Sequence, residues 1–231
     1  MLKVTNLSKS FKSTHVICNI SFLAEKGDVI ALVGKNGTGK TTLLRILADL
    51  VSKDGGKITF ENSDLQRSDT SLITNNDRSF FWRLSSYENL KYFLGMSGLE
   101  SSKIGDSIHM IAKKFRIEDK LDQVFSSLSS GEKKKISLIR MLLKKQKIVL
   151  FDEVTTALDL ETKNLLIQYL KDTQLSEDKK VIIWATHDID EIKGFCSKYI
   201  LLHGASIKKE GILDTDPDKH LNMLKMELDN G

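Results

Sequence analysis

The stretch GKNGTGKT, residues 34–41, decides the fold of this sequence. It matches the pattern G-x-x-x-x-G-K-[ST], in which a glycine-rich loop surrounds a phosphate with its N–H groups pointing inward. An apolar run, Val29–Val33, precedes the loop, and a helical pattern over residues 41–50 follows it. The apolar positions of that expected helix are Leu43, Leu44, Leu47 and Leu50. A strand, a loop and a helix N-terminus in this order predict a nucleotide-binding site.

Individual residues of this loop have distinct predicted roles. Its glycines permit the tight curl and the close approach of a phosphate. Lys40 places a positive charge at the β- and γ-phosphates, and Thr41 offers its hydroxyl to Mg²⁺. The predicted nucleotide-binding residues of this stretch are Gly34, Lys35, Asn36, Gly37, Thr38, Gly39, Lys40, Thr41 and Thr42. We therefore expect ATP and Mg²⁺ as cofactors.

A second element, a pair of acidic residues, follows another apolar run in the stretch IVLFDE of residues 148–153. Its two acids come where a buried strand ends, which is the edge where ligands bind in an open α/β sheet. Asp152 is the predicted support for Mg²⁺, and Glu153 is placed to polarise an attacking water. A pair of solvated acids in a turn is the alternative, and it loses weight because a Mg²⁺-nucleotide site already requires an acid at a strand end.

Short apolar runs alternate with helix-patterned segments along the chain. The expected strands are residues 16–22, 29–33, 57–60, 148–151, 181–185 and 199–202. The expected helices are residues 41–50, 104–115, 132–143 and 160–170. This alternation predicts an α/β fold with a largely parallel sheet. The stretch from about residue 85 to 143 lacks a strand pattern and predicts a helical insertion, whereas the residues after 211 suggest a short polar extension.

Composition narrows the class of protein. The 231 residues suffice for a sizeable core, and 35 basic residues interleaved with 31 acidic ones do not indicate a nucleic-acid partner. Two cysteines without metal-ligand spacing suggest reduced thiols in the cytoplasm. The longest apolar runs have the length of strands, well short of the roughly 20 residues of a spanning helix. We expect a cytoplasmic protein or one bound at the cytoplasmic face of a membrane.

A third element is LSSGE, residues 128–132, about 20 residues before the acidic pair. Ser129 and Glu132 have capping-box spacing, which leaves helix N–H groups available to an anion. With it, the sequence resembles the ATP-binding-cassette (ABC) ATPase family over essentially its whole length. LSSGE resembles the family signature LSGGQ, TTALD (residues 155–159) resembles the segment that joins two subunits' sites, and ATHD (residues 185–188) carries a switch-type histidine, His187.

The resemblance implies a P-loop NTPase core, at about residues 1–84 and 144–231, with an N-terminal antiparallel part. The helical subdomain then covers about residues 85–143. It also implies a head-to-tail dimer around two ATP molecules. In that dimer the catalytic residues are Glu153, His187 and Lys40, Asp152 supports the metal, and Phe11 of LSKSF stacks on adenine. The residues that contact ATP of the other subunit are Ser129, Ser130, Gly131 and Glu132.

The sequence departs from the family pattern at several positions. Asn76 stands where the family has a glutamine that reaches Mg²⁺ and water, and asparagine is shorter by roughly 1.5 Å. Ser130 replaces a signature glycine, and Glu132 replaces a glutamine but keeps the capping box. Val154 replaces the proline that usually follows the catalytic glutamate. These changes bear on rate and coupling rather than on ATP binding.

The aromatic run FFW, residues 80–82, opens the expected helical part. Three adjacent side chains cannot all enter one core, so we expect some to pack inward and others to form an anchor for a partner helix. A purely local cluster that holds the helical part together is the alternative. The stretch DRSFFWRLSSYENL, residues 77–90, resembles the equivalent segment of export-type ABC ATPases.

Three functions are compatible with these motifs to different degrees. The first is the ATPase subunit of a membrane transporter, of export type, with its membrane-spanning permease on a separate chain. The second is a non-transport ATPase for a soluble machinery such as iron–sulfur assembly, because SSGEKKK is similar to that family member. A small-molecule kinase is disfavoured, since LSSGE, TTALD and ATHD would all be coincidences. The sequence leaves the substrate, the identity of the permease and homodimer versus heterodimer open.

Overall fold

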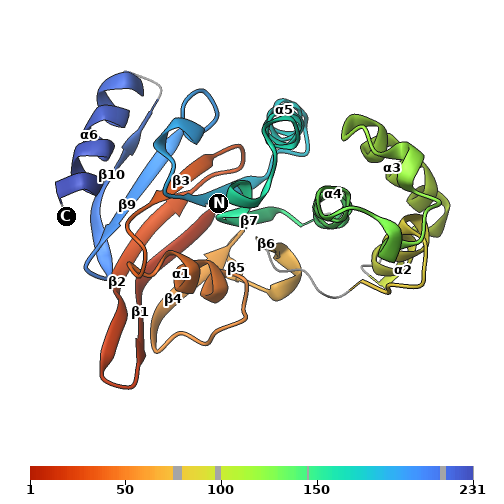
Figure 1. The fold of residues 1–231 in the computed structure, drawn as a ribbon. Helices are drawn as coiled ribbons and strands as arrows, with labels where there is room; N and C mark the ends of the chain where they lie inside the picture. Colours follow the sequence, from red (N-terminus) through yellow and green to blue (C-terminus); the bar gives the residue numbers. More distant parts are fainter. Residues whose placement is uncertain (75–79, 97–99, 145, 214–216, 231) are drawn as a thin grey trace. The chain divides into compact units, whose positions relative to one another are not determined.

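The computed structural model describes residues 1–74, 80–96, 100–144, 146–213 and 217–230 (Figure 1). The chain forms two compact units. The first, here called the core unit, consists of Met1–Leu72, Gln146–Glu153 and Thr173–Gly231. The second, the helical unit, consists of Ile73–Lys145 and Val154–Asp172.

A four-stranded antiparallel sheet forms the N-terminal part of the core unit, with the order β2-β1-β4-β5. Its strands are β1 (Leu2–Phe11), β2 (Thr14–Ala24), β4 (Gly55–Phe60) and β5 (Ser63–Asp64). The sequence predicted β2 and β4 but not β1 as a strand. Register shifts in β1, between Val4 and Leu7 and again near Lys9, interrupt the alternation by which a strand is recognised.

The second sheet has six strands in the order β10-β9-β3-β8-β7-β6. Their bounds are β3 (Val29–Val33), β6 (Thr70–Thr74), β7 (Ile148–Asp152), β8 (Val181–Thr186), β9 (Lys198–His203) and β10 (Ser206–Ile212). The pairs β7/β8, β3/β8 and β3/β9 are parallel, and β9/β10 is antiparallel. Every residue of β3 and β8 is buried, as expected of central strands covered on both faces. The predicted α/β class is confirmed.

Helix α1 (Lys40–Leu47) follows β3 and buries Leu43, Leu44 and Leu47 in the same apolar cluster as Leu32. The expected helix of residues 41–50 was too long, and Leu50 is exposed because the chain has left the helix before it. The expected polar extension was also wrong. Helix α6 (Pro217–Asn230) lies along β10 in Figure 1, and its Leu224 is fully buried.

The helical unit contains α2 (Ser86–Met96), α3 (Ser101–Lys114) and α4 (Ser130–Leu142), and the greater part of α5 (Leu160–Leu175). Phe80 is buried, with its ring stacked on Phe125 at 4.3 Å, whereas Phe81 and Trp82 are exposed. The expectation that the aromatic run divides between core and surface is therefore confirmed. Among the residues that the model describes, no helix has the length and apolar character needed to cross a membrane.

Candidate functional site

Gly34 and Gly39 give the phosphate loop its shape because neither position has room for a side chain. A Cβ at Gly34 would meet Thr38 Oγ1 at 2.6 Å and Leu202 O at 2.8 Å. Gly39 has φ of +100°, and its Cβ would meet Val16 O at 2.6 Å. The loop therefore closes tightly between the end of β3 and the start of α1, which leaves helix N–H groups facing its interior.

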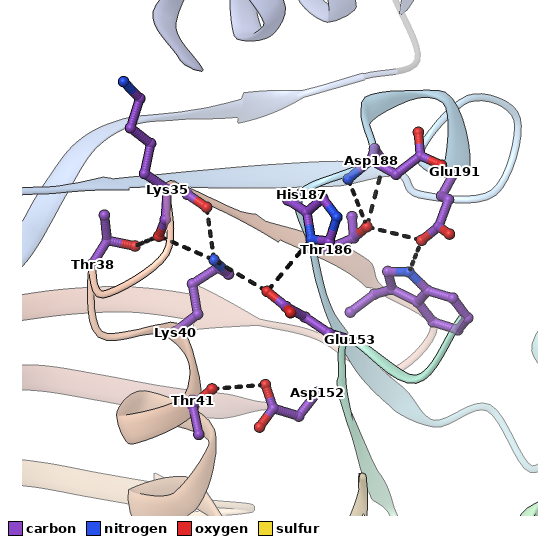
Figure 2. A network of polar contacts seen from close by, with 12 residues as sticks. Lys35, Thr38, Lys40, Thr41, Asp152, Glu153, Thr186, His187, Asp188 and Glu191 are labelled. Carbon is purple, nitrogen blue, oxygen red and sulfur yellow. Dashed lines mark hydrogen bonds and ion pairs between the residues drawn. The ribbon is translucent and has the colours of Figure 1, made fainter. Parts of the chain in front are cut away.

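The Lys40 ammonium group lies at the centre of this loop, as Figure 2 shows. It donates hydrogen bonds to Gly34 O at 2.7 Å and Lys35 O at 3.1 Å, and it lies 3.4 Å from Glu153 Oε1. The Thr38 hydroxyl also donates to Lys35 O, at 2.8 Å. The side chain of Lys40 is only 5% exposed, so its charge is directed to the loop interior, where a phosphate would bind.

Thr41 and Asp152 form a second polar pair beside the loop. The Thr41 hydroxyl donates to Asp152 Oδ1 at 3.0 Å, at the point where β7 ends. Burial raises the pKa of Asp152, and the hydrogen bond from Thr41 opposes this shift. A partly buried carboxylate favours a nearby cation, and a hydroxyl with a carboxylate is a donor set that suits Mg²⁺. In the described ranges, this site included, no group of three or more His, Cys, Asp or Glu side chains could hold a metal.

Glu153 and His187 face each other across the ends of β7 and β8 (Figure 2). Their Oε1 and Nδ1 atoms are 3.7 Å apart, and both side chains are partly exposed. Glu153 has φ of +52°, a left-handed conformation that is unusual for a residue with a side chain. Its N–H donates to Ala185 O at 3.1 Å, which holds the carboxylate beside the end of β8. Such strain is typical of functional sites.

The sheet explains why these groups meet. Parallel pairing places Val33 beside Thr186 and Asp152 beside Ala185, so the carboxyl ends of β3, β8 and β7 lie at one edge. The phosphate loop, the acidic pair and the histidine follow directly from these three strand ends. Ligands bind at this edge in open α/β sheets.

Several predicted site residues lie at the margin of this arrangement. Phe11 is 48% exposed at the end of β1, with the Lys9 ammonium 5.3 Å from its ring centroid. Thr42, in the first turn of α1, is half-buried. Lys35, Asn36 and Gly37 form the exposed tip of the loop. Asn76 lies outside the described residues.

The signature-like stretch belongs to the helical unit, where it begins α4. Ser129 is the N-cap, its hydroxyl accepts from the Glu132 N–H at 3.2 Å, and Glu132 accepts from the Ser129 N–H at 2.8 Å. These bonds hold the pKa of Glu132 below its usual value. Ser130 is exposed, and a Cβ at Gly131 would meet nothing within 4 Å. The predicted capping box is confirmed.

A polar cluster that the sequence did not indicate lies behind His187. It consists of Trp184 and Thr186 of β8 together with Asp188 and Glu191. Glu191 is buried, although its neighbours in the sequence give no sign of a buried acid. Only its position four residues after His187, one helical turn on, could have drawn attention to it.

Comparison with known proteins identifies the chain. The family model described as "ABC transporter" matches residues 17–156, which is more than half of the sequence. The chain belongs to the ABC transporter family. This ABC protein is an ATPase domain that binds and hydrolyses ATP.

Individual relatives agree with this assignment. The ABC chain is 28% identical to the ABC transporter ATP-binding protein NatA of Bacillus subtilis (strain 168) in an alignment of 225 positions that covers 93% of this chain and 91% of NatA. It is 28% identical to the methionine import ATP-binding protein MetN of Clostridium acetobutylicum, over 91% of this chain and 68% of MetN. The solved dimer of MJ0796, a bacterial ABC transporter cassette, has the same fold, with a TM-score of 0.79 and 23% identity over 92% of this chain and 99% of that one.

Proposed function

We propose that this ABC chain is the nucleotide-binding subunit of a membrane transporter and that it pairs head to tail with a second ATPase subunit around two ATP molecules. The observation that carries the proposal is the convergence of Lys40, the Thr41–Asp152 pair and the Glu153–His187 pair at one edge of the sheet. Additional support comes from the dimeric state named for the MJ0796 cassette.

Phosphate binding falls to the loop in this proposal. The Lys40 ammonium exchanges its hydrogen bonds to Gly34 O and Lys35 O for bonds to phosphate oxygens. Thr41 and Asp152 would hold Mg²⁺, which neutralises charge on the β- and γ-phosphates when it is bound. Phe11 stacks on the adenine, and Asn76 takes the place of the glutamine that other members have at the metal.

Hydrolysis requires a base and an orienting group more than covalent chemistry. Glu153 accepts a hydrogen bond from the attacking water, and His187 orients the γ-phosphate and that water. Ser129, Gly131 and the first N–H groups of α4 contact the γ-phosphate bound by the other subunit, and Ser130 and Glu132 complete that contact. A helix N-terminus with unsatisfied N–H groups suits an anion of this kind.

The test of the catalytic assignment is Glu153→Gln in the full chain. Glutamine preserves the shape of the side chain but removes the base, so hydrolysis should slow by about a hundredfold or more while ATP still binds. The closed dimer should then accumulate with ATP, which size-exclusion chromatography with light scattering would detect. An unchanged rate of hydrolysis in Glu153→Gln would refute the assignment.

Glu61 offers a matched control for this test. It is another glutamate of the core unit in a left-handed conformation, with φ of +49°. Its partners are Lys26 and Lys147 on the surface. Glu61→Gln makes the same chemical change, and it should leave hydrolysis unchanged because this residue has no part in the site.

The transporter proposal also names a partner, a membrane-spanning chain that binds the helical unit at the cytoplasmic face. Phe81, Trp82 and Tyr92 are 44%, 57% and 47% exposed, and the rings of Phe81 and Tyr92 pack edge to face at 5.0 Å. Exposed aromatic groups are characteristic anchors of protein interfaces. Trp82→Ala should reduce transport and leave hydrolysis by the isolated chain intact; loss of folding in this variant would instead favour a purely structural cluster.

Export is the direction that residues 77–90 suggest by their resemblance to export-type ATPases. The comparisons give this direction no support, since MetN is named an import protein. Co-purification of the permease from detergent-solubilised membranes tests it: an accompanying substrate-binding protein would contradict export. A soluble assembly machinery is not favoured as the partner, because the relatives named above are transport proteins.

A further inference from the structure

Glu191 places a buried carboxylate directly behind the histidine of the site. The residue is 6% exposed and ends the short 3-10 helix Ile189–Glu191. Its Oε2 atom accepts hydrogen bonds from the Thr186 hydroxyl at 2.8 Å and from Trp184 Nε1 at 3.3 Å (Figure 2). Both donors belong to β8, the strand that leads into His187.

The Thr186 hydroxyl extends this contact to the far side of His187. Its oxygen accepts from the Asp188 N–H at 2.9 Å. The single hydroxyl proton has two acceptors within reach, Glu191 Oε2 at 2.8 Å and Asp188 O at 3.4 Å, and the shorter distance favours Glu191. The chain Glu191–Thr186–Asp188 therefore bridges the residues on both sides of His187.

This bridge holds the backbone that carries the His187 side chain. The His187 ring is 52% exposed, and its Nδ1 atom lies 3.7 Å from Glu153 Oε1, beyond hydrogen-bond distance. The turn from β8 into the 3-10 helix carries the imidazole, so the position of its Cα depends on this turn. Displacement of a catalytic group by about 1 Å is enough to cost on the order of 100-fold in rate.

Packing alone does not explain an acid at this position. Burial of a carboxylate is unfavourable unless hydrogen bonds compensate it, and an apolar side chain would fill the space beside Trp184 without that requirement. Here one carboxylate oxygen accepts both hydrogen bonds from β8. The geometry points to a strong acceptor at this place as the feature that matters.

We propose that Glu191 is a positioning residue for ATP hydrolysis, which acts through Thr186 on the backbone of His187. The inference rests on the proposed role of His187. The hydrogen bonds that Glu191 accepts from Thr186 and Trp184 both lead to β8 rather than to the phosphate loop. The proposal therefore separates chemistry from binding: loss of the acceptor should slow hydrolysis and leave ATP affinity, which Lys40 and Thr41 provide, almost unchanged.

Single-turnover hydrolysis of γ-³²P-labelled ATP, with the full chain in excess, measures both quantities. Glu191→Ala should reduce the rate constant about ten- to a hundredfold, with the half-saturating protein concentration within about twofold of the original. Glu191→Gln should recover most of this loss, because an amide oxygen accepts both bonds. If Gln is as slow as Ala, or if affinity falls in step with the rate, the proposal is refuted.

Phe195→Leu is the matched control for a packing effect. Phe195 is buried, and its ring packs edge to face on Trp184 at 5.2 Å, but it takes no part in the polar bridge. The Phe195→Leu variant should have lower thermal stability but an unchanged hydrolysis rate. A hydrolysis rate as low as that of Glu191→Ala would overturn the proposal. If Glu191→Ala fails to fold, a comparison of Thr186→Val with Thr186→Ser tests the same bridge. Thr186→Val should hydrolyse ATP slowly and Thr186→Ser faster. Equal hydrolysis rates of these two variants would refute the proposal.

His187→Ala distinguishes failure of this inference from failure of the proposed function. When Glu191 acts through His187, the double variant His187→Ala/Glu191→Ala is no slower than His187→Ala alone. A full-rate His187→Ala overturns the assigned role of the histidine together with the inference. A slow His187→Ala beside a full-rate Glu191→Ala overturns the inference alone.

Discussion

Phe80→Ala and Phe81→Ala make the same chemical change at neighbouring positions with different burial. Phe80 is 5% exposed and Phe81 is 44% exposed. A phenylalanine side chain carries about 200 Å² of apolar surface, and burial contributes about 25 cal/mol per Å². Because alanine keeps the Cβ group, the transfer free energy lost is at most about 5 kcal/mol at Phe80 and about 3 kcal/mol at Phe81.

A cavity term adds to this difference of about 2 kcal/mol, because only the Phe80 site is enclosed enough to leave a cavity. Its ring stacks on Phe125 at 4.3 Å and lies 4.5 Å from the Arg140 guanidinium carbon. A desolvated cation over an aromatic face adds further stabilisation. The difference in unfolding free energy between the two variants is more reliable than either value, since errors in the unfolded reference are shared.

Thermal unfolding followed by circular dichroism at 222 nm measures the midpoint temperatures of the two variants. For a chain of 231 residues, 2 kcal/mol corresponds to about 4–8 °C, so Phe80→Ala should unfold at a temperature lower than that of Phe81→Ala by this amount. Equal midpoints, or a lower midpoint for Phe81→Ala, would refute the argument from burial. Hydrolysis should remain close to normal in folded Phe81→Ala, since its ring lies on the surface of the helical unit.

Three further predictions concern the core unit. Asp152→Asn should raise the unfolding free energy of the nucleotide-free chain near pH 7, because the raised pKa of Asp152 means that its charged form opposes folding. Urea titrations should show this gain disappear below about pH 4, where aspartate is protonated in both the folded and the unfolded state. The same variant should abolish the stimulation of ATP hydrolysis by Mg²⁺. A thiol reagent at pH 8 should modify the half-buried Cys18 of the folded chain. It should reach Cys196 only in denaturant, because burial raises the pKa of the Cys196 thiol. Modification of both cysteines in the folded chain would contradict this prediction. Gly39→Ala should abolish ATP binding measured by calorimetry. It should also lower stability more than Gly37→Ala, because the Cβ of the second variant has open space around it. Equal stability of the two variants would contradict the steric argument.

The phosphate loop and the acidic pair could be predicted because each is a continuous local motif. The residues around Lys40 carry the whole geometry of the loop in their own sequence, and the apolar run before Asp152 marks a buried strand. Parallel strand ends then bring the motifs together without further information. Glu191 escaped prediction because its burial depends on tertiary contacts such as those with Trp184 and Thr186, which the sequence cannot place around it.

The differences between the predicted and the observed fold also have physical reasons. The bulged strand β1 loses its alternation at Val4 and Leu7, so its apolar residues no longer form a regular pattern. The sequence of helix α6 does contain helix signals: Pro217 stands at its first position, and Leu221 and Leu224 are spaced for one buried face. The division of the aromatic run between core and surface was predictable, but not that Phe80 is the member that turns inward.

The left-handed backbone of Glu153 has a consequence for directed evolution. A glycine in this conformation avoids a cost of about 1–2 kcal/mol, and it also removes a carboxylate that stands next to Asp152. A library of variants selected for heat resistance alone would therefore enrich Glu153→Gly and discard the base that the reaction needs. Selection on this scaffold must score turnover together with melting temperature, or the most stable survivors will be the inactive ones.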